Sequence, residues 1–182
     1  MVYIFLAEGF EEAEALVPAD LLRRAGAEVK LVGVTGPTVS GAHGISVNSD
    51  ISPDQVQIDG MEMLVIPGGL PGVTNVAASQ KAMELIRAAA QAGCWVGAIC
   101  AAPAMVLGPV GLLQGRKATG YPGTEAGMEG ALPQSGQSVV ADGKFVTGEG
   151  PGAAFDFGLK LVEVLKGTEI MQKVATDACW RH

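Results

Sequence analysis

The sequence is poor in aromatic residues, in charge and in long apolar runs. Only 5% of its 182 residues are aromatic and 17% are charged, while 48% are hydrophobic. Small and medium aliphatic side chains must therefore fill the core, and a chain this apolar is not intrinsically disordered. Its 26 glycines follow no Gly-X-Y period, which excludes a collagen-like helix.

Basic clusters and membrane-spanning segments are also missing. The net charge is -7 and no group of Lys or Arg residues stands out, so we expect no nucleic-acid partner. The apolar run at residues 2–7 ends at Glu8 and lacks a basic segment before it. It is too short for a membrane span or a signal peptide. We therefore expect a cytoplasmic protein with no membrane partner.

Cysteine and histidine are scarce. The three cysteines, Cys94, Cys100 and Cys179, are an odd number in a chain of this length and do not suggest a disulfide framework. The two histidines, His43 and His182, and the lack of paired cysteine spacings give no zinc pattern. We expect neither a metal nor a cofactor.

Apolar segments of strand type alternate with segments of helical period. Strands are predicted at residues 2–7, 28–34, 61–66, 94–99 and 117–119, helices at residues 11–25, 79–92, 100–107, 153–165 and 168–175, and hairpins at residues 39–47 and 138–147. This order predicts an α/β protein, namely a three-layer αβα sandwich with a flavodoxin-like, mostly parallel sheet and a small β-hairpin. The lack of a linker or an internal repeat predicts one domain over residues 1–182.

Cys100 is the strongest candidate for chemistry. It follows a buried strand and opens a helix, with small neighbours that permit a sharp turn, as in a nucleophile elbow. Free amides and the dipole at a helix N-terminus should lower its thiol pKa. The alternative is a buried cysteine that acts as a small hydrophobic residue. Cys94, at the other end of the strand, and Cys179, in the tail, are expected to be inert.

Glu14 is the second candidate. It shares a helical face with Phe10, Val17 and Leu21. Such a carboxylate should be desolvated, and its raised pKa would suit it to general acid–base work. The alternative is that it complements the helix dipole, like the other acids of the first turn. The Pro-Gly-Gly turn at residues 67–69 could present amides to an oxyanion.

Five segments carry a family resemblance. They are LAEGFEEAEALVPADLLRRAG at 6–26, LVIPGG at 64–69, GAICAAPAMVL at 97–107, ATGYPG at 118–123 and GPGAAFDFGLKLVEVLKG at 150–167. Together they resemble the DJ-1/ThiJ/PfpI superfamily, in the branch of its parkinsonism-associated member and that member's bacterial relatives. The resemblance extends over residues 2–175.

The resemblance implies specific roles. Cys100 matches the family's oxidation-prone nucleophile, and Glu14 matches the protonated glutamate that hydrogen-bonds it. Gly69 and Ala101 match positions whose backbone amides face the cysteine or a substrate oxyanion. Family members are typically homodimers without a cofactor. Activities attributed to the family include a glutathione-independent glyoxalase, deglycation of early adducts, and chaperone or redox-sensor functions.

Two hypotheses follow. The first is a cysteine-dependent enzyme that acts on reactive dicarbonyls or glycation adducts and protects against oxidative stress. The second is a non-catalytic redox sensor or chaperone that uses oxidation of Cys100. A glutamine amidotransferase shares the elbow layout, but the sequence has no convincing His–Glu pair for it.

The chain also departs from the family pattern. Tyr121 stands where members with clear glyoxalase activity often have a histidine, and His43 and Glu149 match two arginines near the cysteine pocket. Arg24 is retained. The matching position of His43 reaches the neighbouring subunit's pocket, so His43 could tune the thiolate or carry protons there; the alternative is an exposed turn histidine.

Overall fold

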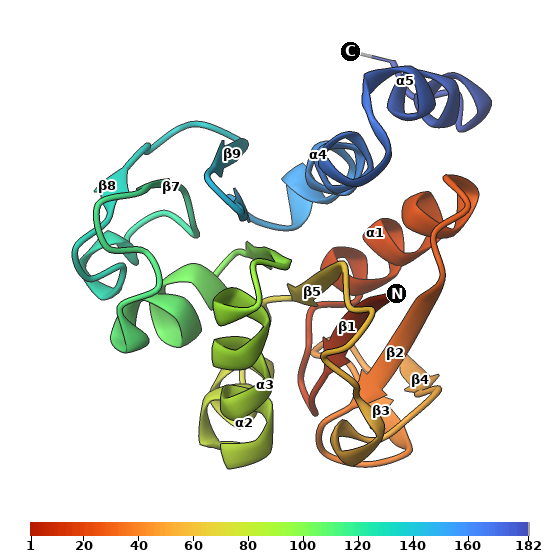
Figure 1. The fold of residues 1–182 in the computed structure, drawn as a ribbon. Coiled ribbons are helices and arrows are strands. Elements are labelled where there is room, and N and C mark those ends of the chain that lie inside the picture. The colour runs from red at the N-terminus through yellow and green to blue at the C-terminus, as the bar shows by residue number, and fades with distance from the viewer. Residues whose placement is uncertain (182) are drawn as a thin grey trace.

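A six-stranded sheet forms the centre of the molecule. In the computed structural model, which describes residues 1–181, the strands lie in the order β2-β1-β5-β6-β10-β9 (Figure 1). Every neighbouring pair is parallel except β9 and β10. The strands are β1 (Val2–Leu6), β2 (Val29–Gly33), β5 (Met63–Ile66), β6 (Trp95–Ile99), β9 (Val139–Asp142) and β10 (Phe145–Gly148). The predicted mostly parallel sheet is confirmed.

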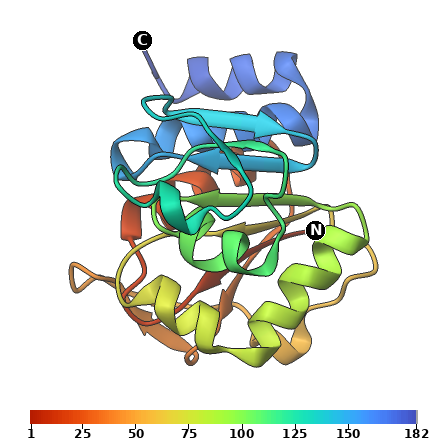
Figure 2. The same ribbon diagram turned by 90° about the vertical axis from the view of Figure 1, so that its left-hand side faces the viewer.

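Helices cover both faces of this sheet. On one face lie α1 (Glu12–Arg24) and α4 (Ala154–Lys166), with α5 (Thr168–Asp177) packed on α4. On the other face lie α2 (Gly72–Ala78) and α3 (Gln80–Gln91). Figure 2 shows the blue C-terminal helices on the opposite side of the molecule from the yellow-green α2 and α3. The three-layer αβα sandwich is therefore confirmed.

The side chains of the strands alternate between two apolar clusters. In β1, Ile4 packs into the cluster beneath α1 and α4, and Phe5 packs into the cluster beneath α2 and α3. Both side chains are completely buried. Each strand is therefore covered on both faces, as expected for parallel strands that read as continuous apolar runs.

The first predicted hairpin forms a separate two-stranded sheet. In it β3 (Thr38–Ser40) pairs with the antiparallel β4 (Ser46–Asn48). The amide of Ala42, in the turn, donates a hydrogen bond to the carbonyl of Phe10. The hairpin turn is thereby held against the loop that leads into α1. The second predicted hairpin, β9–β10, is also confirmed.

Three helical or strand segments differ from the prediction. Residues 72–78 form α2, a helix for which the sequence analysis made no prediction. The predicted helix at residues 100–107 begins later and is a π-helix, η2 (Pro103–Leu107). The predicted strand β7 (Lys117–Ala118) pairs with the unpredicted β8 (Leu132–Pro133). Because these segments are short, tertiary contacts determine their structure more than the local sequence pattern does. The 3₁₀ turns are η1 (Pro53–Gln55), η3 (Gly108–Val110), η4 (Glu125–Gly127) and η5 (Pro151–Ala153).

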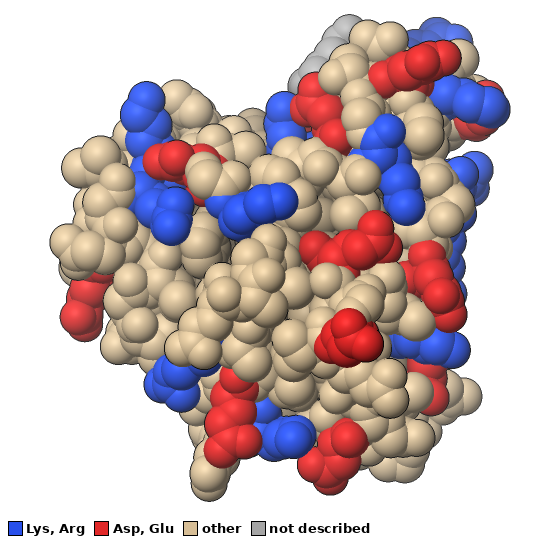
Figure 3. Space-filling view, viewed as in Figure 1, with Lys and Arg blue, Asp and Glu red and all other residues tan. Residues whose placement is uncertain are grey.

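The length of the helices and the distribution of surface charge are relevant to membrane and nucleic-acid partners. Within residues 1–181, no helix is both long enough and apolar enough to cross a bilayer. On the face drawn in Figure 3, Lys and Arg side chains are interspersed with Asp and Glu, and no continuous basic surface covers that face. The absence of a nucleic-acid partner stays a prediction.

The contact between α1 and α4 is close at Gly158. A Cβ there would lie 2.7 Å from Cδ1 of Leu21 and 3.2 Å from Cα of Pro18. We expect Gly158→Val to lower the free energy of unfolding by about 1–3 kcal/mol, because the added methyl groups force the helices apart. Urea denaturation measures this. The control Lys160→Val, on the same helix, should cost less than about 1 kcal/mol; equal losses would contradict the close contact.

Candidate active site

Cys100 lies at the carboxyl end of β6 in a left-handed backbone conformation. Its φ is +64°, which is uncommon for a residue with a side chain. Its amide donates to the carbonyl of Gly148 over 2.9 Å, and its carbonyl accepts from the amide of Tyr121 over 2.8 Å. These two bonds hold the strained residue in place. The side chain therefore stands on a sharp turn, as an elbow nucleophile does.

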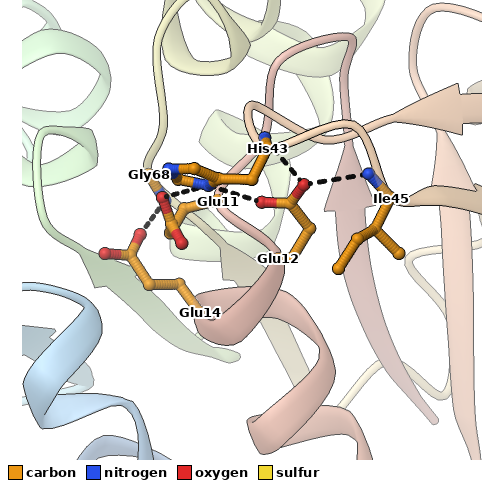
Figure 4. A network of polar contacts seen from close by, with 6 residues as sticks. All are labelled: Glu11, Glu12, Glu14, His43, Ile45 and Gly68. Atoms are coloured by element: carbon orange, nitrogen blue, oxygen red, sulfur yellow. Dashed lines mark hydrogen bonds and ion pairs between the residues drawn. The ribbon is translucent and has the colours of Figure 1, made fainter.

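Glu14 extends from the first turn of α1 and is completely buried. Its Oε2 accepts a hydrogen bond of 2.7 Å from the amide of Gly68, seen in Figure 4. Among the described residues, Oε1 has no hydrogen-bond partner. Burial is the main reason that the pKa of Glu14 rises from 4.5 to about 7, although the Gly68 amide and the Cys100 side chain lower it. Such a carboxyl can take up and release a proton near neutral pH.

Cys100 and Glu14 meet over the backbone of Gly68. A Cβ at Gly68 would lie 2.5 Å from Cβ of Cys100, 2.6 Å from Oε2 of Glu14 and 3.0 Å from the cysteine Sγ. Only glycine leaves room for both side chains at this point. The turn at residues 67–69 was predicted to present amides to an oxyanion. The amide of Gly68 instead donates to Glu14, a contact that was not predicted, and the Pro-Gly-Gly sequence was the available signal for it.

The Cys100 sulfur is a thiol in this environment. Burial, followed by the neighbouring charge of Glu14, raises the pKa of Cys100 to about 12, while the amides of Ala101 and Gly69 lower it. The predicted lowering of the thiol pKa is therefore wrong. Desolvation outweighs the two amides, and regular helical structure begins only after Cys100. The nucleophile needs a base, and Glu14 is the adjacent one.

The other two cysteines lie in different surroundings. Cys94 is buried at the start of β6, and its thiol donates to the carbonyl of Met61 over 3.2 Å. Cys179 is exposed after α5. Neither is a member of the Cys100–Glu14 site, so both serve as control positions.

His43 contacts the start of α1 in its own chain. Its Nδ1 lies 3.0 Å from Oε2 of Glu12 and 3.5 Å from Oε2 of Glu11 (Figure 4). The hydrogen bond to Glu12 and the two negative charges raise the pKa of His43. Backbone amides of His43 and Ile45 donate to Oε1 of the same Glu12. Glu12 thus clamps the β3–β4 turn to α1. The action of His43 in a partner's pocket stays a prediction.

The side chains of Glu11, Glu12 and His43 are potential metal ligands. Among residues 1–181, Glu11, Glu12 and His43 form the group whose ligand atoms lie within 4.8 Å of one another. The sequence spacing gave no sign of it, because the turn brings His43 to the helix from a distant part of the chain. Both oxygens of Glu12 already accept hydrogen bonds from the turn. We interpret the cluster as the clamp.

Two other candidates are placed differently. Arg24 lies ten residues after Glu14, about 15 Å along the helix, and its Nε pairs with Oδ2 of Asp20 over 2.7 Å. It does not reach Cys100 within one chain. Tyr121 is bonded to Cys100 through its amide, and its side chain is half-exposed beside a cavity of about 320 Å³.

The site combines a strained cysteine at a strand-to-helix turn with a buried glutamate, and it lies on an αβα sandwich. These features define an α/β protein with a cysteine at a nucleophile elbow. The model of the DJ-1/PfpI family matches residues 1–164. The protein dj-1beta of Drosophila melanogaster is 37% identical over 94% of this chain and 92% of its own. The chain belongs to the DJ-1/PfpI family, which confirms the resemblance found in the sequence.

Two further comparisons support this. The glutathione-independent glyoxalase DJR-1.2 of Caenorhabditis elegans is 32% identical over 94% of this chain and 91% of its own. The solved structure of oxidized DJ-1 from Toxoplasma gondii has a TM-score of 0.94 and 35% identity, with 100% of this chain and 98% of that one covered. The family therefore includes a protein named as a glyoxalase.

The raised pKa of Glu14 makes stability depend on pH. A carboxyl with a folded pKa of about 7 and an ordinary value of 4.5 stabilises the fold below pH 4.5, and this stabilisation is lost as the pH rises through 7. Glu14→Gln should remove the loss. The free energy of unfolding of Glu14→Gln minus that of the wild type should therefore increase by up to about 3 kcal/mol from pH 4.5 to pH 8. Denaturation at a series of pH values measures this, and a constant difference would show that Glu14 does not titrate there.

Proposed function

We propose that this protein is a cofactor-free, cysteine-dependent enzyme that converts methylglyoxal and water to lactate without glutathione. The observation that carries the proposal is the buried Glu14 carboxyl, with a pKa of about 7, beside the Cys100 sulfur. The likeness to a relative named as a glutathione-independent glyoxalase supports it. The proposal extends to other small dicarbonyls and to glycation adducts, and so to protection against oxidative stress.

The first step forms a covalent adduct. Ionised Glu14 takes the thiol proton as Sγ of Cys100 adds to the aldehyde carbon, and the carbonyl oxygen then receives that proton, so that a hemithioacetal results. The amides of Gly69 and Ala101, which face the sulfur, support the developing oxyanion. The free oxygen of Glu14, Oε1, is available for this proton exchange.

The second stage moves hydrogen within the adduct. Glu14 removes the proton from the former aldehyde carbon and returns a proton to the neighbouring carbon, while the proton of the hemithioacetal hydroxyl passes to the former ketone oxygen. The product is a lactoyl thioester. Water then adds to the thioester, lactate leaves and the Cys100 thiol is restored. The sequence consumes one methylglyoxal and one water and needs no external oxidant or reductant.

The proposal includes a homodimer of single-domain chains in the cytoplasm. Arg24 pairs with Asp20 at the end of α1 away from Glu14, so it enters a cysteine pocket only from a partner chain. His43 and Tyr121 are the other candidates for a pocket of this kind. The aromatic Tyr121 cannot carry protons at neutral pH as an imidazole does, which leaves proton transfer to Glu14.

A redox sensor or chaperone is the second candidate function. It is favoured by the partial exposure of Cys100 and by the two amides that face its sulfur. Two molecules of hydrogen peroxide would convert the thiol to a sulfinic acid and yield two waters. A mass gain of two oxygens at Cys100 under mild peroxide, without lactate formation from methylglyoxal, would favour this function over the enzyme.

The pH dependence of turnover tests the proposed function. We expect kcat/KM for methylglyoxal to rise with pH and level off above about 7, because Glu14 must be ionised to act as the base. Glu14→Gln should lose roughly 10²–10⁴-fold in kcat/KM and lose the rise with pH. Lactate formation measured enzymatically gives these rates.

Cysteine variants provide the control. Cys100→Ala should abolish lactate formation, whereas Cys94→Ala and Cys179→Ala should retain it, since neither thiol belongs to the site. Turnover that survives in Cys100→Ala, or that is absent from the wild type at every pH, would contradict the enzyme hypothesis.

A further inference from the structure

The backbone of Gly68 is bound twice by the start of α1. Its amide donates to Oε2 of Glu14 over 2.7 Å, and its carbonyl accepts from the amide of Glu11 over 3.0 Å. Glu11 is the N-cap of α1, and the first amides of a helix have no partner within it. Figure 4 shows both glutamates beside Gly68. The start of one helix therefore supplies the carboxyl of the site and also holds the backbone next to it.

The hydrogen bond to the Gly68 carbonyl sets the direction of the next amide. The peptide that joins Gly68 to Gly69 is trans, and in a planar trans peptide the C=O and N–H groups point in opposite directions. Because the Gly68 carbonyl points to Glu11, the Gly69 N–H points the other way, toward the Cys100 sulfur. This N–H is one of the two amides that support the oxyanion in the proposed reaction.

Without this bond the peptide could turn over. Glycine adopts positive and negative φ about equally well, so a peptide between two glycines rotates at low cost. Gly69 has a φ of +91°, and turning the peptide over would carry this angle into the negative region. The Gly68 carbonyl would then face the sulfur in place of the N–H. Since a carbonyl oxygen repels an oxyanion, the turned peptide would oppose the reaction that the observed one supports.

The surroundings of Gly69 fit the observed orientation. A Cβ at Gly69 would lie 2.3 Å from the nitrogen of Glu11 and 2.5 Å from the carbonyl oxygen of Gly9, so glycine is needed for the close approach to the start of α1. The carbonyl of Gly69 accepts from the amide of Val73, in α2, over 3.0 Å. The peptides on the two sides of Gly69 are therefore held by two different helices.

We propose that the backbone amide of Glu11 is a positioning group of the active site. It holds the Gly68–Gly69 peptide so that an N–H, and not a carbonyl, faces the oxygen of the carbonyl group that Cys100 attacks. This inference deepens the proposed function, on which it rests, and applies to any attack of Cys100 on a carbonyl carbon. The side chain of Glu11 has no part in it, since its Oε2 lies 3.5 Å from Nδ1 of His43.

Two reactions of Cys100 separate support of the oxyanion from general reactivity of the thiol. p-Nitrophenyl acetate acetylates the thiol through a tetrahedral oxyanion and releases p-nitrophenol. Iodoacetamide alkylates the same thiol by displacing iodide, and no oxyanion forms. Both rates are measured at Cys100 by peptide mass spectrometry in a Cys94→Ala, Cys179→Ala background. The ratio of acetylation to alkylation is then compared between variants, because changes in the ionisation of the sulfur affect both reactions.

Three proteins that differ at residue 11 are compared. Glu11→Ala removes the side chain but keeps the amide, and it is the reference. Glu11→Pro removes the amide, and the φ of −79° at this position suits proline. The third protein has lactic acid, the hydroxy-acid analogue of alanine, at residue 11, so that an ester oxygen replaces the N–H. Loss of one oxyanion donor costs roughly 10²–10³ in rate, and a released peptide still adopts the active orientation part of the time. We therefore expect the proline and ester proteins to have a ratio at least about tenfold lower than Glu11→Ala.

The ester protein decides the result if Glu11→Pro folds poorly, because the ester keeps the shape of the backbone. A ratio equal to that of Glu11→Ala, even where both rates fall together, would overturn the proposal. So would a reference protein in which p-nitrophenyl acetate does not acetylate Cys100. Because methylglyoxal is not used and lactate is not measured, these outcomes are separate from failure of the glyoxalase hypothesis.

Discussion

The site depends on the close approach of a thiol and a carboxyl to a single peptide. Sγ of Cys100 and Oε2 of Glu14 lie 3.0 and 2.6 Å from the position that a Cβ of Gly68 would take. Burial raises the pKa of both groups, so that Glu14 titrates near neutral pH and Cys100 keeps its proton. The chemistry of the pair is therefore transfer of a proton from sulfur to carboxyl, coupled to attack, rather than the action of a preformed thiolate.

The surrounding fold holds these groups in place. The elbow at Cys100 is fixed by hydrogen bonds to Gly148 and Tyr121, which come from segments far apart in the sequence. α1 carries Glu14 into the same place because its apolar face packs on the sheet and on α4. The clamp of Glu12 on the His43 turn secures the start of that helix. Strain at the cysteine is thus supported by contacts from several elements.

Much of the fold and the core of the site could be predicted from the sequence. Continuous apolar strands, helical periods and the position of Cys100 after a strand identified the sandwich and the elbow. Glu14 became a candidate because a carboxylate lay in an apolar stripe, but that pattern did not separate it from the other acids of the first turn, and the family resemblance selected it. The direction of the thiol pKa was not predictable, since it depends on burial that no local pattern reports. The His43 clamp was missed for a similar reason, because the hairpin turn brings it to α1 only in the folded chain.

The titration of Glu14 is the most direct test of this account. Infrared difference spectroscopy of the whole protein should show the carbonyl band of a buried, protonated carboxyl that disappears with a midpoint near pH 7 and is absent in Glu14→Gln. That result would place a proton acceptor of suitable strength beside the Cys100 thiol. A midpoint near 4.5, the ordinary value for glutamate, would contradict the proton-transfer pair on which the proposed chemistry rests.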